Sequence, residues 1–336
     1  MKRLSIGIVG AGEITRRAHL PVLTNTPNVQ IAWLYDHRPE SVLTLARAYR
    51  LEALHSLAPE ALPACDIALL AIPVDARGDY LRHFSRQGTA VFCEKPFAMS
   101  AAEHLLLAEQ FAPHALGCGF MRRFFRSTML LRRIVAEGIF GSLLRMDISE
   151  GNRSKGSGVD SSFLDDPRLG ASRGVLADLG SHTIDMALYV SGASAFEVRS
   201  HTLVLDGAVD RKVTAQVTLQ GASSSPSRSI ELNYGASWLD RQDNRIRLIF
   251  PHAIVWSDLS VSADVYVGSP ENPRDNLLLT SEDVGARTYN QAFFLEWRNF
   301  LEGFRAQRES LVSARSALLT TSLVESLLNT ETALPN

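Results

Sequence analysis

Short apolar runs alternate with amphipathic segments over the first 120 or so residues. The runs that predict buried strands are Leu4–Val9, Val29–Tyr35, Asp66–Ile72, Thr89–Cys93 and Ala115–Phe120. The segments between them predict helices over Glu13–Leu23, Pro39–Arg50, Asp75–Gln87 and Ser100–Phe111. Strands that alternate with helices in this way are typical of a doubly wound parallel sheet, so we expect a Rossmann-type domain over residues 1–122.

The pattern changes after about residue 124. Predicted helices over Phe125–Glu137 and around Asp178–Val190 flank a strand and a long loop rich in Gly, Ser and Asp at 151–172. Strand-like runs with little helix between them follow at Glu197–Leu205, Val213–Leu219, Ser229–Tyr234, Arg245–Phe250 and Ala253–Trp256. These runs predict an open, mostly antiparallel sheet in an α+β domain over residues 123–336, whose C-terminal amphipathic helices can pack back on the first domain.

A glycine-rich turn, Gly10-Ala-Gly12, lies between the first predicted strand and the first helix. Gly10 permits a tight turn, and Gly12 lets the backbone approach a pyrophosphate at the helix N-terminus. Asp36 follows the second strand, where a carboxylate accepts hydrogen bonds from ribose hydroxyls and repels a 2′-phosphate. This favours NAD, although Arg38 could accommodate NADP. Thr15 occupies the third glycine position of the fingerprint, and a structural turn that binds no nucleotide is the alternative.

Composition and charge narrow the classes of protein. The 336 residues are 46% hydrophobic and 21% charged, with a net charge of −2, which is ordinary for a globular protein and argues against a nucleic acid or an anionic membrane as the main partner. No apolar run approaches the roughly 18 residues of a membrane span. The three cysteines are too few and too unpatterned for a disulfide scaffold or a zinc site, so a reducing cytoplasm is the expected location.

Two polar clusters are candidates for chemistry. Glu94-Lys95-Pro96 follows a buried strand, at the edge of the sheet where ligands bind in doubly wound folds; a loop ion pair is the alternative. Asp178 and His182 lie one helical turn apart with Asp185 on the same side, so that a carboxylate can orient an imidazole acting as general base. The alternatives are a metal site and a solvated Asp178 beside an unrelated His182. Because no second histidine lies at a matching offset, we expect no metal.

Together these motifs resemble the Gfo/Idh/MocA family (glucose–fructose oxidoreductase, inositol dehydrogenase and MocA). The resemblance covers nearly the whole chain and rests on the segments Gly10-Ala-Gly12, His19-Leu-Pro21, Asp36, Glu94-Lys95-Pro96, Gly119-Phe-Met-Arg-Arg123-Phe124, Gly138-Ile-Phe-Gly141, Asp178-Leu-Gly-Ser-His182 and Phe294-Leu-Glu-Trp-Arg-Asn-Phe300. It implies an NAD(P)-dependent oxidoreductase that moves a hydride between the nicotinamide and a secondary alcohol or ketone of a sugar, sugar derivative or cyclitol.

The resemblance also implies roles for residues. Lys95 would hydrogen-bond the reacting hydroxyl, His182 would take its proton, and Asp178 would tune His182. The family's open sheet commonly mediates dimers or tetramers, so a homodimer or homotetramer through the C-terminal sheet is expected. The residues expected to bind the cofactor are Gly10, Gly12, Glu13, Ile14, Asp36, Arg38, Ile72, Pro73, Glu94 and Lys95; those considered for the substrate are Arg123, Arg173 and Asp185.

Two departures from the family pattern concern arginines. Arg77 stands four residues after Pro73, where the family usually has a histidine. Arg173 stands where the family usually has glycines, and it could bind an anionic group of the substrate or point into solvent. Other functions on the same fold are a non-catalytic dinucleotide sensor, an NAD-assisted glycosidase, and an imine or enone reductase.

Overall fold

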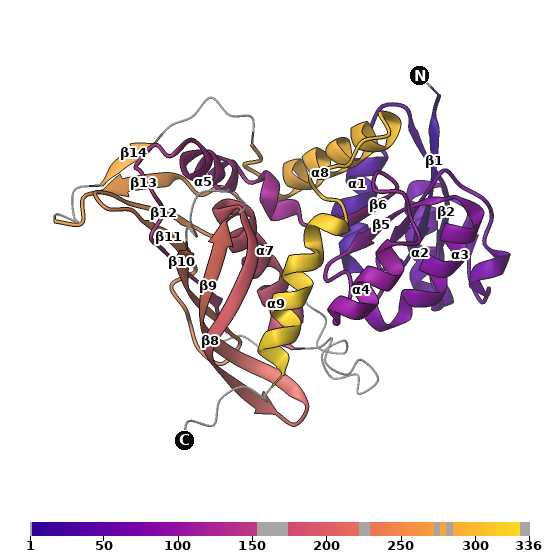
Figure 1. Ribbon diagram of the computed structural model, residues 1–336. Helices are drawn as coiled ribbons and strands as arrows, with labels where there is room; N and C mark the ends of the chain where they lie inside the picture. Colours follow the sequence, from indigo (N-terminus) through magenta and orange to yellow (C-terminus); the bar gives the residue numbers. More distant parts are fainter. Residues whose placement is uncertain (1, 153–173, 222–228, 272–275, 280–284, 330–336) are drawn as a thin grey trace. The chain divides into compact units, whose positions relative to one another are not determined.

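The computed structural model describes residues 2–152, 174–221, 229–271, 276–279 and 285–329. The chain forms two compact units (Figure 1). The first comprises Met1–Met121 and Tyr289–Leu318, and the second comprises Arg122–Thr288 and Leu319–Asn336. The chain therefore returns to the first unit after completing most of the second, and the N-terminal unit is discontinuous in sequence.

In its described residues, the first unit contains a six-stranded parallel sheet with the order β3-β2-β1-β4-β5-β6. The strands are β1 (Leu4–Val9), β2 (Val29–Tyr35), β3 (Ala53–Leu54), β4 (Ile67–Leu70), β5 (Ala90–Glu94) and β6 (Leu116–Gly119). This confirms the predicted doubly wound sheet. The order reverses between β1 and β4, and ligands of such sheets bind outside the carboxyl ends of the strands at this point.

The helices of the first unit begin and end where the sequence provides stop signals. They are α1 (Leu20–Leu23), which follows a π-helical turn at Thr15–His19, α2 (Pro39–Tyr49), α3 (Gly78–Gln87), α4 (Ala101–Ala108) and the returning α8 (Tyr289–Arg305). Ser100 caps α4 by accepting a hydrogen bond from the Glu103 N–H at 3.4 Å, the contact typical of a capping box. Gly88 ends α3 in the left-handed region with φ 70°.

Aromatic residues join α8 to the first sheet. Trp297 and Phe300 of α8 lie against Phe92 of β5, with ring centroids 4.5 and 5.1 Å apart. Gly117 of β6 leaves the space for these rings, because a Cβ there would come within 2.6 Å of Phe92 and 2.9 Å of Phe300. Residues near the C-terminus thus complete the core of the N-terminal sheet.

In its described residues, the second unit has an eight-stranded sheet with the order β14-β13-β12-β11-β7-β10-β9-β8. Its strands are β7 (Arg145–Gly151), β8 (Ala193–Asp206), β9 (Val209–Gly221), β10 (Ser229–Ser237), β11 (Arg245–Ile249), β12 (Ile254–Asp258), β13 (Val265–Gly268) and β14 (Leu277–Leu279). The β7–β10 pair is parallel and the other pairs are antiparallel, which confirms the predicted mostly antiparallel sheet.

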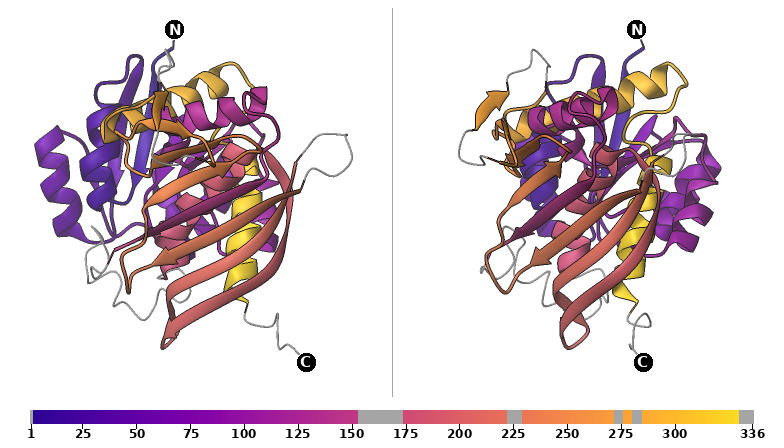
Figure 2. Two further views of the ribbon diagram at one scale, coloured as in Figure 1. Left: turned by 90° about the vertical axis from the view of Figure 1, so that its left-hand side faces the viewer. Right: turned by 60° about the vertical axis from the view of Figure 1, so that its left-hand side comes forward.

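Helices cover one face of this sheet and leave the other face without a helix (Figure 2). The helices of the unit are α5 (Arg126–Glu137), α7 (Ser181–Ser191) and α9 (Leu318–Leu328), and α7 packs on β7, β8 and β9. Residues that alternate with the buried ones form the other face, which contains a hollow of about 540 Å³ lined mainly by polar side chains. No helix among the described residues is long and apolar enough to cross a membrane.

Candidate active site

The turn between β1 and the first helix has a backbone that requires glycine. Gly10 has φ 108°, and a Cβ there would lie 2.3 Å from the Ala71 carbonyl oxygen. A Cβ at Gly12 would meet no heavy atom within 4 Å, so the backbone is open on the side where a pyrophosphate would approach. Thr15, which replaces the third glycine, donates its hydroxyl proton to the Gly10 carbonyl oxygen at 2.6 Å and thereby braces the turn.

Asp36 links the end of β2 to this turn. Its Oδ2 accepts the Ala11 N–H at 2.7 Å, and its Oδ1 accepts the Arg38 N–H at 2.9 Å. The Arg38 side chain is half exposed with Nε 3.6 Å from Oδ1. Glu13 and Ile14 begin the helix. The Glu13 carboxylate pairs with Arg16 at 2.7 Å, so the part of Glu13 that suits a phosphate is its backbone N–H. These features fit a dinucleotide with an unphosphorylated ribose.

The Lys95 loop at the end of β5 is anchored by a buried network. His19 is fully buried and lies between two partners: its Nδ1 is 3.0 Å from Trp297 Nε1, and its Nε2 is 2.9 Å from Glu94 Oε1. Because an indole N–H can only donate, Nδ1 accepts, and the ring is neutral with its proton on Nε2, donated to Glu94. The other carboxylate oxygen of Glu94 accepts the backbone N–H of Lys95 at 3.1 Å.

The negative charge of Glu94 is stabilised in its buried position. Burial raises the pKa of this carboxyl, but the hydrogen bond from His19 and the nearby charges, including those of Lys95 and Arg77, outweigh that cost and leave the pKa below its ordinary value. Glu94 is therefore an ionised anchor for the loop, and a simple Glu94–Lys95 ion pair, the alternative raised by the sequence, is not needed to explain its position.

Arg77 lies directly behind this loop. Its side chain is buried, its Nε donates to the Ile72 carbonyl oxygen at 2.9 Å, and its Nη1 donates to the carbonyl oxygens of both Glu94 and Pro96. The backbone at Ile72, which follows β4, is thus joined through one guanidinium to the residues on either side of Lys95.

In the second unit, Asp178 and His182 lie on a helix that is otherwise largely buried. The helix starts with a π-helical segment, Leu176–Gly180, and continues as α7. Between Gly174 and Leu188 every residue is buried except Asp178, Leu179 and His182. A titratable pair is therefore partly exposed on one side of a helix whose other sides are packed.

An aspartate that sequence reasoning missed starts this helix. Asp210 of β9 is buried, and its Oδ2 accepts the Leu176 N–H at 2.7 Å. Gly174 makes room for it, since a Cβ at that position would lie 1.3 Å from Asp210 Oδ1. The cap comes from a distant strand, so local helix signals could not reveal it.

Arg123 and Asp185, two of the three residues considered for the substrate, bind each other instead. Arg123 Nε donates to Asp185 Oδ2 at 2.9 Å, and Arg123 Nη2 donates to Asp185 Oδ1. Thr320 of α9 adds a hydrogen bond to Asp185 Oδ1 at 3.2 Å, and both members of the pair are buried. The pair joins α7 and α9, and we do not carry it into the proposed substrate site. Arg173, the third residue, lies outside the described residues.

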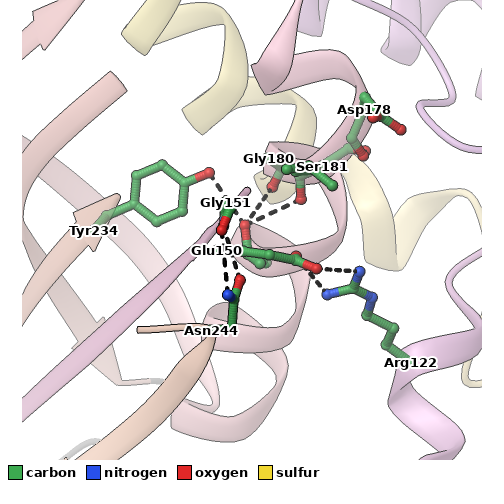
Figure 3. Close-up of polar contacts among 10 residues, drawn as sticks. Arg122, Glu150, Gly151, Asp178, Gly180, Ser181, Tyr234 and Asn244 are labelled. Atoms are coloured by element: carbon green, nitrogen blue, oxygen red, sulfur yellow. Dashed lines mark hydrogen bonds and ion pairs between the residues drawn. The ribbon is translucent and has the colours of Figure 1, made fainter. Parts of the chain in front are cut away.

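A second arginine–carboxylate pair lies near the start of α7 (Figure 3). Arg122 donates to both oxygens of Glu150 at 2.7 and 2.9 Å, and both side chains are mostly buried. In the same region Tyr234 of β10 is 3.1 Å from the Thr183 hydroxyl, and Asn244 accepts the Gly151 N–H at 2.9 Å. Within the described residues, no group of three or more His, Cys, Asp or Glu side chains is placed to hold a metal ion.

Comparison with family models identifies both parts of the chain. Residues 4–115 match a model described as an oxidoreductase family with an NAD-binding Rossmann fold, and residues 128–252 match the GFO/IDH/MocA C-terminal domain. Together the two matches span more than half of the sequence.

Individual relatives agree with these models. An inositol 2-dehydrogenase of Rhizobium meliloti is 27% identical over 241 residues, which cover 68% of this chain and 69% of the relative. A scyllo-inositol 2-dehydrogenase (NAD(+)) of Bacillus subtilis is 22% identical over 317 residues, covering 91% of this chain and 87% of the relative. The crystal structure of an aldose-aldose oxidoreductase from Caulobacter crescentus has the same fold, with a TM-score of 0.79 at 18% identity, covering 97% and 96% of the two chains.

Proposed function

The chain belongs to the GFO/IDH/MocA family of NAD-binding oxidoreductases, and from this membership we propose that it transfers a hydride between a secondary alcohol of a sugar or cyclitol and a nicotinamide dinucleotide. One observation carries the proposal: Asp178 and His182 are a partly exposed titratable pair on a helix that is otherwise largely buried. Paired carboxylate and imidazole groups of this kind suit general base catalysis near neutral pH.

Each residue has one task in the proposed reaction. A nicotinamide dinucleotide held by the first unit would supply the hydride acceptor for oxidation of the alcohol. Lys95 donates a hydrogen bond to the reacting oxygen and opposes the negative charge that develops on it, while His182 accepts the hydroxyl proton. Asp178 orients the imidazole of His182. The turn at Gly10 and Gly12 holds the pyrophosphate, and Asp36 binds the ribose hydroxyls, which favours NAD over NADP.

The ion pairs near the site favour an uncharged substrate. Arg122 is neutralised by Glu150, and Arg123 is neutralised by Asp185. A buried guanidinium that already binds a carboxylate in two places has little free capacity for a second anion. For the part of the site that the structure describes, we therefore propose a neutral polyol, sugar or inositol rather than a sugar phosphate or sugar acid; Arg173 lies outside those residues.

The polar outer face of the second unit's sheet supports a proposal about assembly. Trp256 and Tyr266 on neighbouring strands stack with centroids 4.5 Å apart, and Arg245 lies 4.2 Å above the Trp256 ring. Leu277 and Leu278 on the edge strand are exposed. Because aromatic residues and arginine are enriched in protein interfaces, we propose that this face binds a second copy of the chain.

An activity screen tests the hydride-transfer proposal. The purified protein is mixed with NAD or NADP and with inositols, polyols, sugars, sugar phosphates or sugar acids, and absorbance in the reduced nicotinamide band is followed. We expect Lys95→Ala and His182→Asn each to lower kcat by about 10²–10⁴-fold, the usual contribution of a positioned acid–base group.

Matched variants show whether the loss is specific. Lys2→Ala removes a surface lysine that pairs with Asp66, and His252→Asn changes an exposed histidine between β11 and β12. Neither should change turnover. Unaltered turnover in Lys95→Ala would refute the proposed mechanism. Tight NAD binding without turnover would favour a sensor, and turnover that needs only catalytic NAD would favour a glycosidase.

A further inference from the structure

We infer that Arg77 is a positioning residue for Lys95, an inference that rests on the proposed function of that lysine. One atom of Arg77, Nη1, donates to the carbonyl oxygens of Glu94 and Pro96, which are the residues immediately before and after Lys95. The Nε of the same side chain donates to the Ile72 carbonyl oxygen at 2.9 Å. The guanidinium therefore fixes the backbone on both sides of Lys95 relative to the end of β4.

The surroundings of Arg77 are unusual for an arginine. The residue is only 3% exposed, and none of the ion pairs among the described residues includes it. A buried charge is costly unless hydrogen bonds compensate. Here three backbone carbonyls provide those hydrogen bonds, and two of them flank Lys95. The conformation of the loop and the stabilisation of the buried guanidinium therefore depend on each other.

His19 supports the same loop through the Glu94 side chain, whereas Arg77 supports it through backbone carbonyl oxygens. His19 holds the Glu94 side chain at 2.9 Å, and that carboxylate accepts the Lys95 N–H at 3.1 Å. Arg77 holds the carbonyl oxygens on the two sides. These contacts hold the backbone on both sides of Lys95 and so fix the position from which its side chain extends.

Arginine combines enough donors with the planar geometry that this arrangement needs. A guanidinium has five N–H groups in a fixed plane, whereas a neutral histidine, the residue usual in the family at this position, donates one hydrogen bond. A lysine has three donors but lacks the planar fork. This chain therefore uses Arg77 to do what a histidine at the same place could not, namely to bind three carbonyls at once.

Kinetics of Arg77 variants test the inference. A displacement of about 1 Å in a positioned group can cost about 10²-fold in rate. We expect Arg77→Met, which is similar in length but has no donor, to lower kcat about 10–100-fold on the substrate found in the screen, while the Kd for NAD changes less than about threefold. Arg77→Lys should retain more activity, and Arg86→Met on the exposed side of α3 should behave as wild type.

Two further measurements separate positioning from a merely structural effect. Guanidinium ion added at millimolar concentration should restore part of the kcat of Arg77→Ala but none of that of Lys95→Ala. Hydrogen–deuterium exchange of the NAD-bound protein should be faster at the Lys95 amide in Arg77→Met than in Arg86→Met, and this measurement needs no substrate.

The outcomes distinguish the two proposals. If Lys95→Ala retains turnover, the proposed function fails whatever Arg77 does. If Lys95→Ala abolishes turnover while Arg77→Met has wild-type kcat and wild-type exchange at the Lys95 amide, the positioning role is wrong and the proposed function stands. A lower melting temperature of Arg77→Met without a change in kcat would also overturn the positioning role.

Discussion

Two buried histidines in the first unit are kept neutral by different means. His19 is neutral because Trp297 donates to one ring nitrogen while the other donates to Glu94. His104 of α4 is fully buried, and its Nε2 donates to the Ala314 carbonyl oxygen at 2.8 Å. Burial lowers the pKa of His104 to about 4, although the hydrogen bond to Ala314 opposes this shift.

The His104 shift predicts how stability depends on pH. The unfolded state binds the proton near pH 6.5 and the native state only near pH 4, so the free energy of unfolding should fall as the pH drops from about 6.5 to about 4. Between pH 7 and pH 5 the loss from this residue is about 2 kcal/mol. Urea unfolding at both pH values should show that loss in the wild type and not in His104→Gln; equal losses in both would contradict the assignment.

At the residue scale, the sequence predicts best those groups of residues that lie close together along the chain. Gly10 and Gly12 occupy one turn between consecutive elements, and Asp178 and His182 lie one turn apart on a helix, so spacing alone sufficed to predict that each pair lies close together. Asp36 follows the next strand, and its hydrogen bond from the Ala11 N–H connects it to the glycine turn. The environment of Asp185 could not be predicted in this way, because it depends on Arg123, 62 positions away, and on Thr320, 135 positions away. Periodicity shows which residues share a helix face, but not which partner from elsewhere covers that face.

At the scale of elements, the contact of α8 with the first sheet predicts a specific sensitivity. A methyl group at Gly117 would overlap Phe92 and Phe300, whereas a Cβ at Gly221 of β9 would meet nothing within 4 Å. Overpacking of a core typically costs about 1–3 kcal/mol. We expect Gly117→Ala to lose that much in free energy of unfolding and Gly221→Ala to lose little. A Gly117→Ala variant as stable as the wild type would show that α8 does not pack as described.

Elements with strong local patterns were predicted well, and those defined by their neighbours were not. The buried strands β1, β2, β4, β5 and β6 contain near-continuous apolar runs between turn signals. The short strands β3, β13 and β14 are recognisable only by the strands beside them. The parallel pairing of β7 with β10 likewise follows from long-range topology, which no local run of residues encodes.

For the whole molecule, the proposed self-association through the second unit's sheet predicts a change in mass. Tyr266→Glu places a charge in the Trp256–Tyr266 stack, where an unpaired charge in an interface would be strongly unfavourable. We expect light scattering to give a dimer or tetramer for the wild type and a smaller species for Tyr266→Glu. Leu106→Glu, an exposed position on α4, should keep the wild-type mass. A monomeric wild type would refute the proposal.

The return of the chain to the first unit has a consequence for protein synthesis. A ribosome makes β1 to β6 early, but Trp297 and Phe300, which cover Phe92 and Gly117, emerge only after most of the second unit has been made. The nascent Rossmann sheet therefore has an uncovered aromatic patch while residues 122–288 are being made. Its folding can finish only once α8 has emerged, so a ribosome stalled before α8 would carry an incompletely folded nucleotide-binding unit, the kind of species that chaperones bind.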